Sequence, residues 1–115
     1  MDSAVNMYRL FQLQKQWSEK TFGKYEDRFE IGGDVGLLKH LIEEANEVLD
    51  ETKPEKIPEE LADITIILME LWMIHGLKFE DMINLVRAKQ IKNEHRVWPS
   101  IVDQDPSNPV NHDRS

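Results

Sequence analysis

Four carboxylates stand in two pairs whose spacing suits the binding of a divalent cation. Glu44 and Glu47 are three residues apart, and so are Glu60 and Asp63. On an α-helix, side chains three positions apart have Cβ atoms about 5–6 Å apart and can reach one ion. Carboxylate oxygens are hard ligands, and Mg²⁺ is the cation that such ligands usually hold near phosphates. The two pairs therefore predict a Mg²⁺ site, in which Mn²⁺ can substitute.

The negative charge of the chain is concentrated around these pairs. Residues 43–63 contain nine acidic residues against two lysines, so they carry −7 of the formal net charge of −8. Such a block repels itself unless a cation relieves it. A solvated acidic face is the common reason for a charge run, but here the carboxylates border apolar helix stripes, where bare anions are costly. This placement favours the metal site.

A basic cluster further along the chain has the chemistry that a phosphate chain needs. Lys89, Asn93 and Arg96 follow at i, i+4 and i+7 and share one helix face, with Lys92 beside them. Cationic and amide donors of this kind take up phosphate charge. The alternative is a basic helix end stabilised by the helix dipole.

Two tryptophans are candidates for stacking on a planar ring of a ligand. Trp17 precedes the first glycine and Trp98 follows the basic cluster, and we predict both as substrate-binding residues. The alternative is that aromatic residues at helical spacing belong to the core, which is the interpretation adopted for Trp72. His40 and His75 have no second ligand at metal spacing, and both are interpreted as structural or as supporting a ligand.

The elements that position these residues are helices. Apolar residues recur at helical spacing in four segments, namely 5–21, 34–50, 58–75 and 79–97. Asp34 is the predicted N-cap of the second helix, Pro58 fits the first turn of the third, and a loop is expected over 22–33. The third helix is apolar all round, which predicts a central, buried helix.

These segments predict an all-α, four-helix bundle. The second and third helices are joined by a short connection containing Pro54, so they should pack antiparallel with the metal site between them. The bundle domain is predicted over residues 1–98. Residues 99–115 contain three of the five prolines and no periodicity, and we expect an irregular tail.

Composition excludes several classes of protein. With 115 residues and 40% hydrophobic residues, the chain is sufficient for one modest core. The absence of cysteine excludes disulfides, thiolate zinc sites and a cysteine nucleophile. No apolar run reaches the ~18 residues of a membrane span, and an acidic chain is a poor binder of nucleic acid. Because the first residues do not resemble a secretory signal, a cytoplasmic location is expected, in the host if the gene belongs to a phage.

The carboxylates also carry a family resemblance. Glu43-Glu44-x-x-Glu47, followed after twelve residues by Glu60-x-x-Asp63, resembles the EExxE…ExxD signature of the MazG-like all-α nucleoside triphosphate pyrophosphohydrolases. The resemblance covers about residues 5–98. It implies that Glu44, Glu47, Glu60 and Asp63 hold two or more Mg²⁺ ions. It also implies cleavage of a nucleoside triphosphate to the monophosphate and pyrophosphate. A water must then lose a proton, and Glu43 and Glu47 are the candidate catalytic bases.

The segment from Lys89 to Trp98 is similar to a short, phage- and bacteria-type branch of that superfamily that is assigned to purine nucleotides. This resemblance favours a purine (d)NTP, with dGTP or GTP first and dATP second. The alternatives are a broad or pyrimidine-specific housecleaning hydrolase, or a non-catalytic acidic helical module that only docks partners. Asp34, Gln14 and the tail contain candidate acceptors for the base.

The apolar third helix also predicts self-association. One chain of this length cannot cover so broad an apolar surface, so we expect a homodimer or a tetramer built from dimers. Family members are often tetrameric, and a neighbouring subunit is expected to contribute to the pocket.

Overall fold

A computed structural model describes residues 6–99 and 105–111. Within these residues the chain is entirely helical apart from its connections, which confirms the predicted all-α class. The elements are α1 (Met7–Phe22), α2 (Tyr25–Glu30), α3 (Gly33–Asp50), the short 3₁₀ helix η1 (Pro54–Lys56), α4 (Ile57–Ile74) and α5 (Phe79–Glu94). The chain forms two compact units, residues 1–82 and 83–115.

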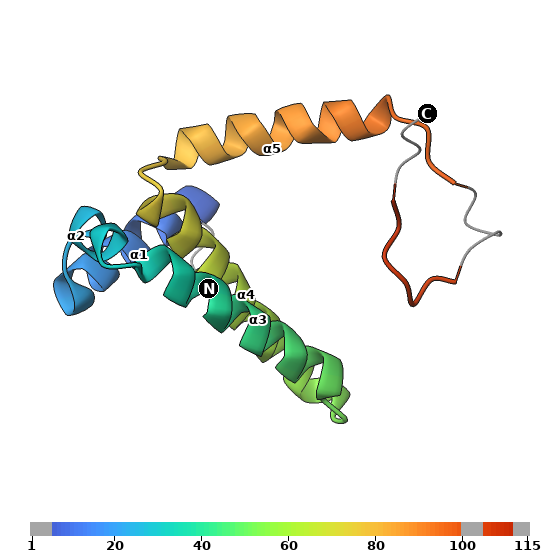
Figure 1. The fold of residues 1–115 in the computed structure, drawn as a ribbon, viewed down its shortest axis with the longest axis horizontal. Helices are drawn as coiled ribbons and strands as arrows, with labels where there is room; N and C mark the ends of the chain where they lie inside the picture. Colours follow the sequence, from blue (N-terminus) through green and yellow to red (C-terminus); the bar gives the residue numbers. More distant parts are fainter. Residues whose placement is uncertain (1–5, 100–104, 112–115) are drawn as a thin grey trace. The chain divides into compact units, whose positions relative to one another are not determined.

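The first unit is organised around the hairpin of α3 and α4. These helices lie side by side and antiparallel, joined through η1 (Figure 1). α1 packs against α4, and α2 touches both α3 and α4. The antiparallel pairing of the two acidic helices agrees with the prediction. It places the C-terminal half of α3 beside the N-terminal half of α4, which are the segments that contain the carboxylate pairs.

The prediction of a loop over 22–33 was wrong, because this segment contains α2. Its only apolar residues are Tyr25 and Phe29, one turn apart, so its length of six residues is too short to show a period. The predicted N-cap at Asp34 was also wrong. α3 starts at Gly33, after Gly32 with φ of 86°, and Asp34 lies in the first turn, where its charge suits the helix dipole.

Gly33 allows α2, α3 and α4 to approach closely. A Cβ atom at this position would lie 2.8 Å from the carbonyl oxygen of Arg28 and 3.1 Å from Cδ1 of Ile74. The first of these contacts is with rigid backbone, so any larger residue would push α2 away from α3. The other glycine within α3, Gly36, has no neighbouring atom within 4 Å of such a Cβ position.

The core lies where α1, α2, α4 and the start of α5 meet. It consists of Phe11, Tyr25, Met69, Met73, Ile74 and Met82, with Leu37, Trp72 and Phe79 packed against it. Trp72 therefore belongs to the core, as predicted. The prediction of a buried third helix holds only in part for the single chain. The buried residues of α4 all lie in its second half, but Ile66 and Leu68 of that half remain 39% and 44% exposed, and Leu61 of the first half remains 48% exposed.

Tyr25 is buried with its hydroxyl unpartnered, and this predicts a specific loss of stability at high pH. Burial raises the pKa of Tyr25 to about 12, and only 3% of the residue is exposed. The folded chain therefore keeps a proton that the unfolded chain loses above pH 10, so stability must fall between pH 10 and 12. Between pH 10 and 12, the free energy of unfolding measured with urea should fall by about 1–2 kcal/mol less in Tyr25→Phe than in the wild type.

Tyr8→Phe is the matched control, since Tyr8 is 44% exposed and its hydroxyl accepts a hydrogen bond from Gln12. If the free energy of unfolding falls equally between pH 10 and 12 in the wild type and in Tyr25→Phe, the interpretation of Tyr25 is wrong.

Candidate active site

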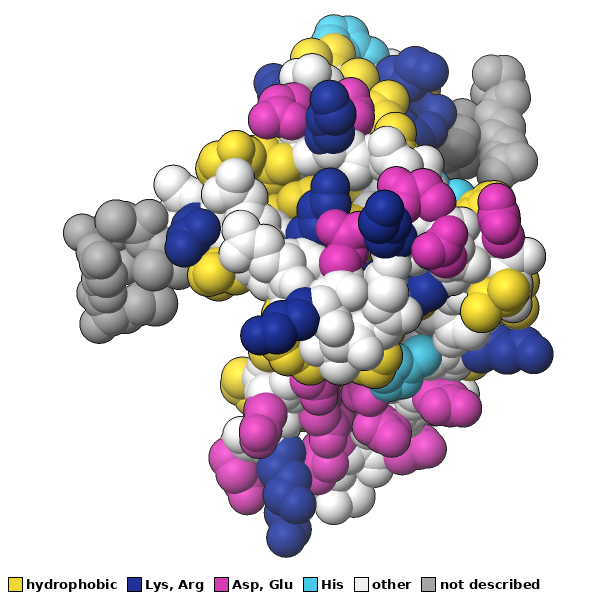
Figure 2. Space-filling model, turned by 90° about the vertical axis from the view of Figure 1, so that its left-hand side faces the viewer, with side chains coloured by type: hydrophobic (Ala, Val, Ile, Leu, Met, Phe, Trp, Pro, Cys, Tyr) yellow, Lys and Arg dark blue, Asp and Glu magenta, His cyan; other side chains and the backbone are white. Residues whose placement is uncertain are grey.

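The carboxylates gather at the end of the α3–α4 hairpin that adjoins η1. Figure 2 shows the acidic side chains crowded over this end of the hairpin, in the lower part of the view. An open hollow of about 390 Å³ lies among them and is lined by Asn46, Glu47, Asp50, Glu51 and Glu60. Two of the four predicted metal ligands, Glu47 and Glu60, therefore face one hollow from two different helices.

The other two predicted ligands adjoin this group. Glu44 lies one turn before Glu47 on α3, and Asp63 lies one turn after Glu60 on α4. The Oε1 atom of Glu44 is 3.2 Å from Nε2 of His40, one turn earlier. His40 thus supports a carboxylate of the cluster, which agrees with its interpretation from the sequence.

Two carboxylate oxygens in this group are buried without a partner. The Oε2 atoms of Glu44 and Glu60 are shielded from solvent and accept no hydrogen bond. A buried carboxylate oxygen without a donor is strongly disfavoured, so two of them within one cluster favour the binding of a cation or the uptake of a proton.

The carboxylates raise the pKa of one another. The pKa of Glu47 is raised, chiefly because the negative charge of Glu44 lies nearby, with smaller effects from its own burial and from Glu43 and Asp63. The site is therefore short of positive charge as it stands. Glu43 itself is exposed, and its negative charge helps to raise the pKa of Glu47.

Glu51 is a member of the cluster that sequence reasoning missed. The pKa of Glu60 is raised, first by burial and then by the neighbouring carboxylate of Glu51. The pKa of Glu51 is lowered instead, because the backbone N–H of Lys53 donates to its Oε1 atom at 3.0 Å. The sequence spacing of Glu44, Glu47 and Glu51 is i, i+3 and i+7, but Glu51 is the C-cap residue that follows α3, with extended backbone, so helical spacing alone does not place it.

The side chains do not yet form a closed coordination shell. In the described part of the chain, no three acidic or histidine side chains converge on one point that would hold a metal ion.

An apolar pocket of about 500 Å³ adjoins the carboxylates, formed by α1, α2, α3 and α4. It contains His40 at one edge, and Trp17 and Phe22 meet edge to face in its wall with ring centres 5.5 Å apart. Trp17 is 55% exposed, so it is not a core residue, and its role in substrate binding stays a prediction.

The predicted phosphate-binding residues belong to the second unit. Lys89, Lys92 and Asn93 lie on α5, and Arg96 and Trp98 follow its end. Asn93 organises this group: its Oδ1 atom accepts from Arg96 at 3.0 Å, and its carbonyl oxygen accepts from Nε1 of Trp98 at 2.7 Å. The structure therefore brings Asn93, Arg96 and Trp98 together, with both lysines exposed on the same helix.

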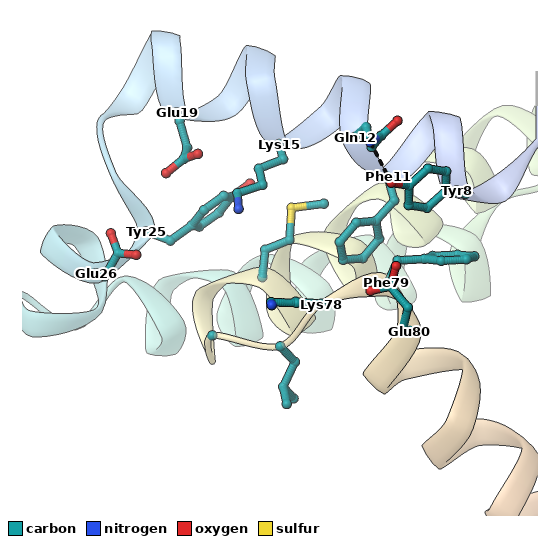
Figure 3. A pocket seen from close by; sticks show the side chains of 13 residues that line it. Tyr8, Phe11, Gln12, Lys15, Glu19, Tyr25, Glu26, Lys78, Phe79 and Glu80 are labelled. Atoms are coloured by element: carbon teal, nitrogen blue, oxygen red, sulfur yellow. Dashed lines mark hydrogen bonds between the residues drawn. The ribbon is translucent and has the colours of Figure 1, made fainter.

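A further cavity lies far from the carboxylates. It has about 480 Å³ and is formed by α1, α2 and the segment from α4 into α5, with Tyr8, Phe11 and Phe79 on one side and Lys15 and Lys78 on the other (Figure 3). It lies beyond the C-terminal end of α4, whereas the carboxylates lie at the N-terminal end, about 24 Å away along the helix. It is therefore not part of the acidic site.

Comparison with known families decides the general chemistry. Residues 10–115 match the sequence profile of a family described as dATP/dGTP pyrophosphohydrolase. The chain belongs to the dATP/dGTP pyrophosphohydrolase family. Comparisons with the curated proteins and with the solved structures gave no match.

Membership in this family identifies the protein as an enzyme, a nucleoside triphosphate pyrophosphohydrolase, and confirms the MazG-like resemblance. The match includes residues 99–115, which the sequence set apart as a tail, so the family's region extends beyond the predicted domain. In that tail, residues 105–111 contain a turn in which Asp105 accepts from the backbone of Ser107. Residues 100–104 and 112–115 lie outside the described part. None of the helices described has the length and hydropathy of a membrane span.

Proposed function

We propose that this pyrophosphohydrolase hydrolyses purine (deoxy)nucleoside triphosphates with Mg²⁺ held by the carboxylates of α3 and α4. The observation that carries this proposal is the pair of buried, unpartnered oxygens of Glu44 and Glu60 within a cluster of like charges. A divalent cation is the partner that such a cluster lacks, and a triphosphate is a substrate that brings such cations with it.

The donor set suits Mg²⁺. All its members are hard carboxylate oxygens, and Glu44, Glu47, Glu60 and Asp63 are the proposed ligands, with two or more ions. Glu51 joins the site through its contact with Glu60. When bound, Mg²⁺ supplies charge neutralisation of the phosphates and acidification of a water molecule.

The chain's own residues then hold and move the proton. Water attacks the α-phosphorus, the bond from that phosphorus to the bridging oxygen breaks, and pyrophosphate leaves. Glu47 or Glu43 accepts the proton of the attacking water. Glu47 faces the hollow among the carboxylates, so its carboxylate is placed to take up this proton. Glu43 is the alternative because it is exposed beside Glu47.

The basic residues of α5 are proposed to bind the phosphate chain. Lys89, Lys92 and Arg96 are three cations within eight residues, and Asn93 adds an amide. Charge-assisted hydrogen bonds from such groups are shorter and stronger than neutral ones. Arg96 is already oriented by its bond to Asn93, so less of its freedom is lost on binding.

The proposed substrate order places dGTP or GTP first and dATP second. The family description names both purines, and Lys89–Trp98 resembles a purine branch. Guanine is placed first because its N1–H and N2–H donors can be selected by an acceptor in the pocket. We expect kcat/KM for dGTP to exceed that for dCTP and dUTP by at least about 100-fold. The measurement is pyrophosphate release from a panel of (d)NTPs with and without Mg²⁺. Equal values across the panel would instead indicate the broad housecleaning alternative.

A second copy of the chain is proposed to cover the exposed apolar surface of α1 and α4. An apolar groove of about 470 Å³ runs between these helices, with Leu10 and Leu13 on one side and Ala62, Ile66 and Met69 on the other. Exposed apolar surface of this extent is typical of an interface, so a homodimer or a tetramer of dimers remains the proposed assembly.

A further inference from the structure

The apolar pocket beside the carboxylates has the position that a nucleobase requires. Asp63, Ile67, Glu70 and Ile74 follow on one face of α4 at spacings of four, three and four residues. The last three line the pocket, whereas Asp63 belongs to the acidic cluster. Glu70 is about 10 Å beyond Asp63 along the helix, which is comparable with the reach of a nucleotide from its α-phosphate to its base.

The other wall of the pocket shows the same continuity. His40 lines the pocket and also contacts Glu44 of the cluster at 3.2 Å. A ligand with its phosphates at the carboxylates can therefore place an apolar ring between Trp17, Phe22 and Ile67. The volume of about 500 Å³ lies within the usual range for small-molecule pockets.

The buried carboxylate of Glu70 holds the side chain of Gln14 in this pocket by a hydrogen bond. Glu70 is only 6% exposed although it lies on an apolar helix. Its Oε1 atom accepts from Nε2 of Gln14 at 2.7 Å, and its Oε2 atom accepts from the hydroxyl of Ser18 at 3.1 Å. Arg28 donates to the same hydroxyl at 3.0 Å and lies 3.9 Å from Glu70 Oε2, which balances the buried charge.

Gln14 lines this pocket and also the groove between α1 and α4, and the network decides which end of its amide is left to accept a hydrogen bond. An ionised carboxylate only accepts hydrogen bonds, so Glu70 must hold the NH₂ end of Gln14. The Oε1 atom of Gln14 accepts no hydrogen bond in the described part of the chain. The pocket therefore has apolar and aromatic walls, an acceptor at Gln14 and, in the guanidinium of Arg28, buried donors.

We propose that this pocket is the purine subsite and that Gln14, oriented by Glu70, is its specificity-determining residue. This inference rests on the proposed function and extends it to the base. An acceptor at Gln14 Oε1 matches the N1–H and N2–H donors of guanine, which lie next to each other. Adenine offers its N6–H₂ group as the only donor on that edge, so it binds less well. The two-ring width of a purine fills the space between the walls better than a pyrimidine does.

Gln14→Leu tests the acceptor, with the deoxynucleoside triphosphate of unsubstituted purine as a second substrate. That base has the same rings as guanine but no N–H donor on its Watson–Crick edge. We expect the wild type to prefer dGTP over it by about 100-fold in kcat/KM, and Gln14→Leu to reduce this preference at least about 10-fold. Gln16→Leu is the matched control, since Gln16 is on the same helix, exposed, and outside the pocket.

Gly36→Leu tests the pocket itself. Gly36 lines the pocket, and no atom lies within 4 Å of the position that a Cβ atom would take there, so a larger side chain fits the helix and fills the cavity. Leucine is also the better helix former, so the fold should be kept. We expect KM for dGTP to rise at least about 10-fold, with the Mg²⁺-induced rise in Tm unchanged. Lys39→Leu, on the same helix but outside the pocket, should retain the wild-type KM.

The outcomes separate this inference from the function on which it rests. If the wild type shows Mg²⁺-dependent pyrophosphate release but Gln14→Leu and Gly36→Leu behave as their controls do, the purine subsite is elsewhere. If the wild type itself releases no pyrophosphate with Mg²⁺, the proposed function fails before the subsite is tested.

Discussion

Asp63→Asn is expected to lower kcat for pyrophosphate release from dGTP by about 1,000-fold while the protein stays folded. The substitution keeps the size of the side chain but removes the charge that holds the cation. A metal ion stabilises the charge of such a transition state by several kcal/mol, and a loss of about 4 kcal/mol corresponds to this factor. Asp63 is exposed, so its replacement removes no core contact. The measurement is pyrophosphate release at saturating dGTP and Mg²⁺.

Glu59→Gln is the control for this experiment. Glu59 is an exposed carboxylate in the first turn of α4, next to Glu60, and it does not line the acidic hollow. The substitution Glu59→Gln removes one negative charge from the same helix as Asp63→Asn does. The Glu59→Gln variant should retain nearly full activity. If Asp63→Asn retains more than a tenth of the wild-type kcat, Asp63 is not a residue of the active site.

Mg²⁺ is expected to raise the Tm of the wild type by about 10 °C, and Glu60→Gln is expected to remove most of this rise. A ligand at 100 times its dissociation constant stabilises the folded state by about 2.7 kcal/mol. In a domain of this size, each kcal/mol corresponds to about 4 °C. The buried Oε2 atom of Glu60 loses its uncompensated charge when an amide replaces the carboxylate. The metal-free variant should therefore melt at a higher temperature than the metal-free wild type.

Differential scanning calorimetry with Mg²⁺ and with EDTA measures both effects. Glu55→Gln is the control, because Glu55 is an exposed residue of η1 outside the hollow. It should leave the Mg²⁺-induced rise unchanged. A wild-type Tm that is the same with Mg²⁺ and with EDTA would mean that the folded carboxylates bind no cation.

The helices that could be predicted from the sequence are those with a sustained apolar period. α3 and α4 each extend over 18 residues, and their predicted ends agree with the structure within one residue. α2 was missed because its six residues contain too few apolar positions for a period. The start of α3 was misplaced because Gly32, rather than a polar cap, ends the preceding turn with a positive φ.

In the site, too, the features that depend on nearby residues could be predicted, and those that depend on residues far apart in the sequence could not. The pairs Glu44–Glu47 and Glu60–Asp63 follow from spacing within one helix, and the antiparallel hairpin follows from a short connection. The purine pocket depends on contacts between distant residues: Gln14 and Glu70 are 56 positions apart, and Ser18 and Glu70 are 52 apart. No local pattern indicates such pairs. The only sequence signal was Glu70 itself, an acid within an apolar helix.

Binding of Mn²⁺ followed by electron paramagnetic resonance tests the central claim most directly, because it detects the cation without any turnover. Titration of the metal-free protein should show bound Mn²⁺ that Mg²⁺ displaces. The bound signal should be weakened at least about 10-fold in Glu60→Gln and in Asp63→Asn, and retained in Glu59→Gln. Equal Mn²⁺ binding by all four proteins would contradict a metal site on the carboxylates of α3 and α4.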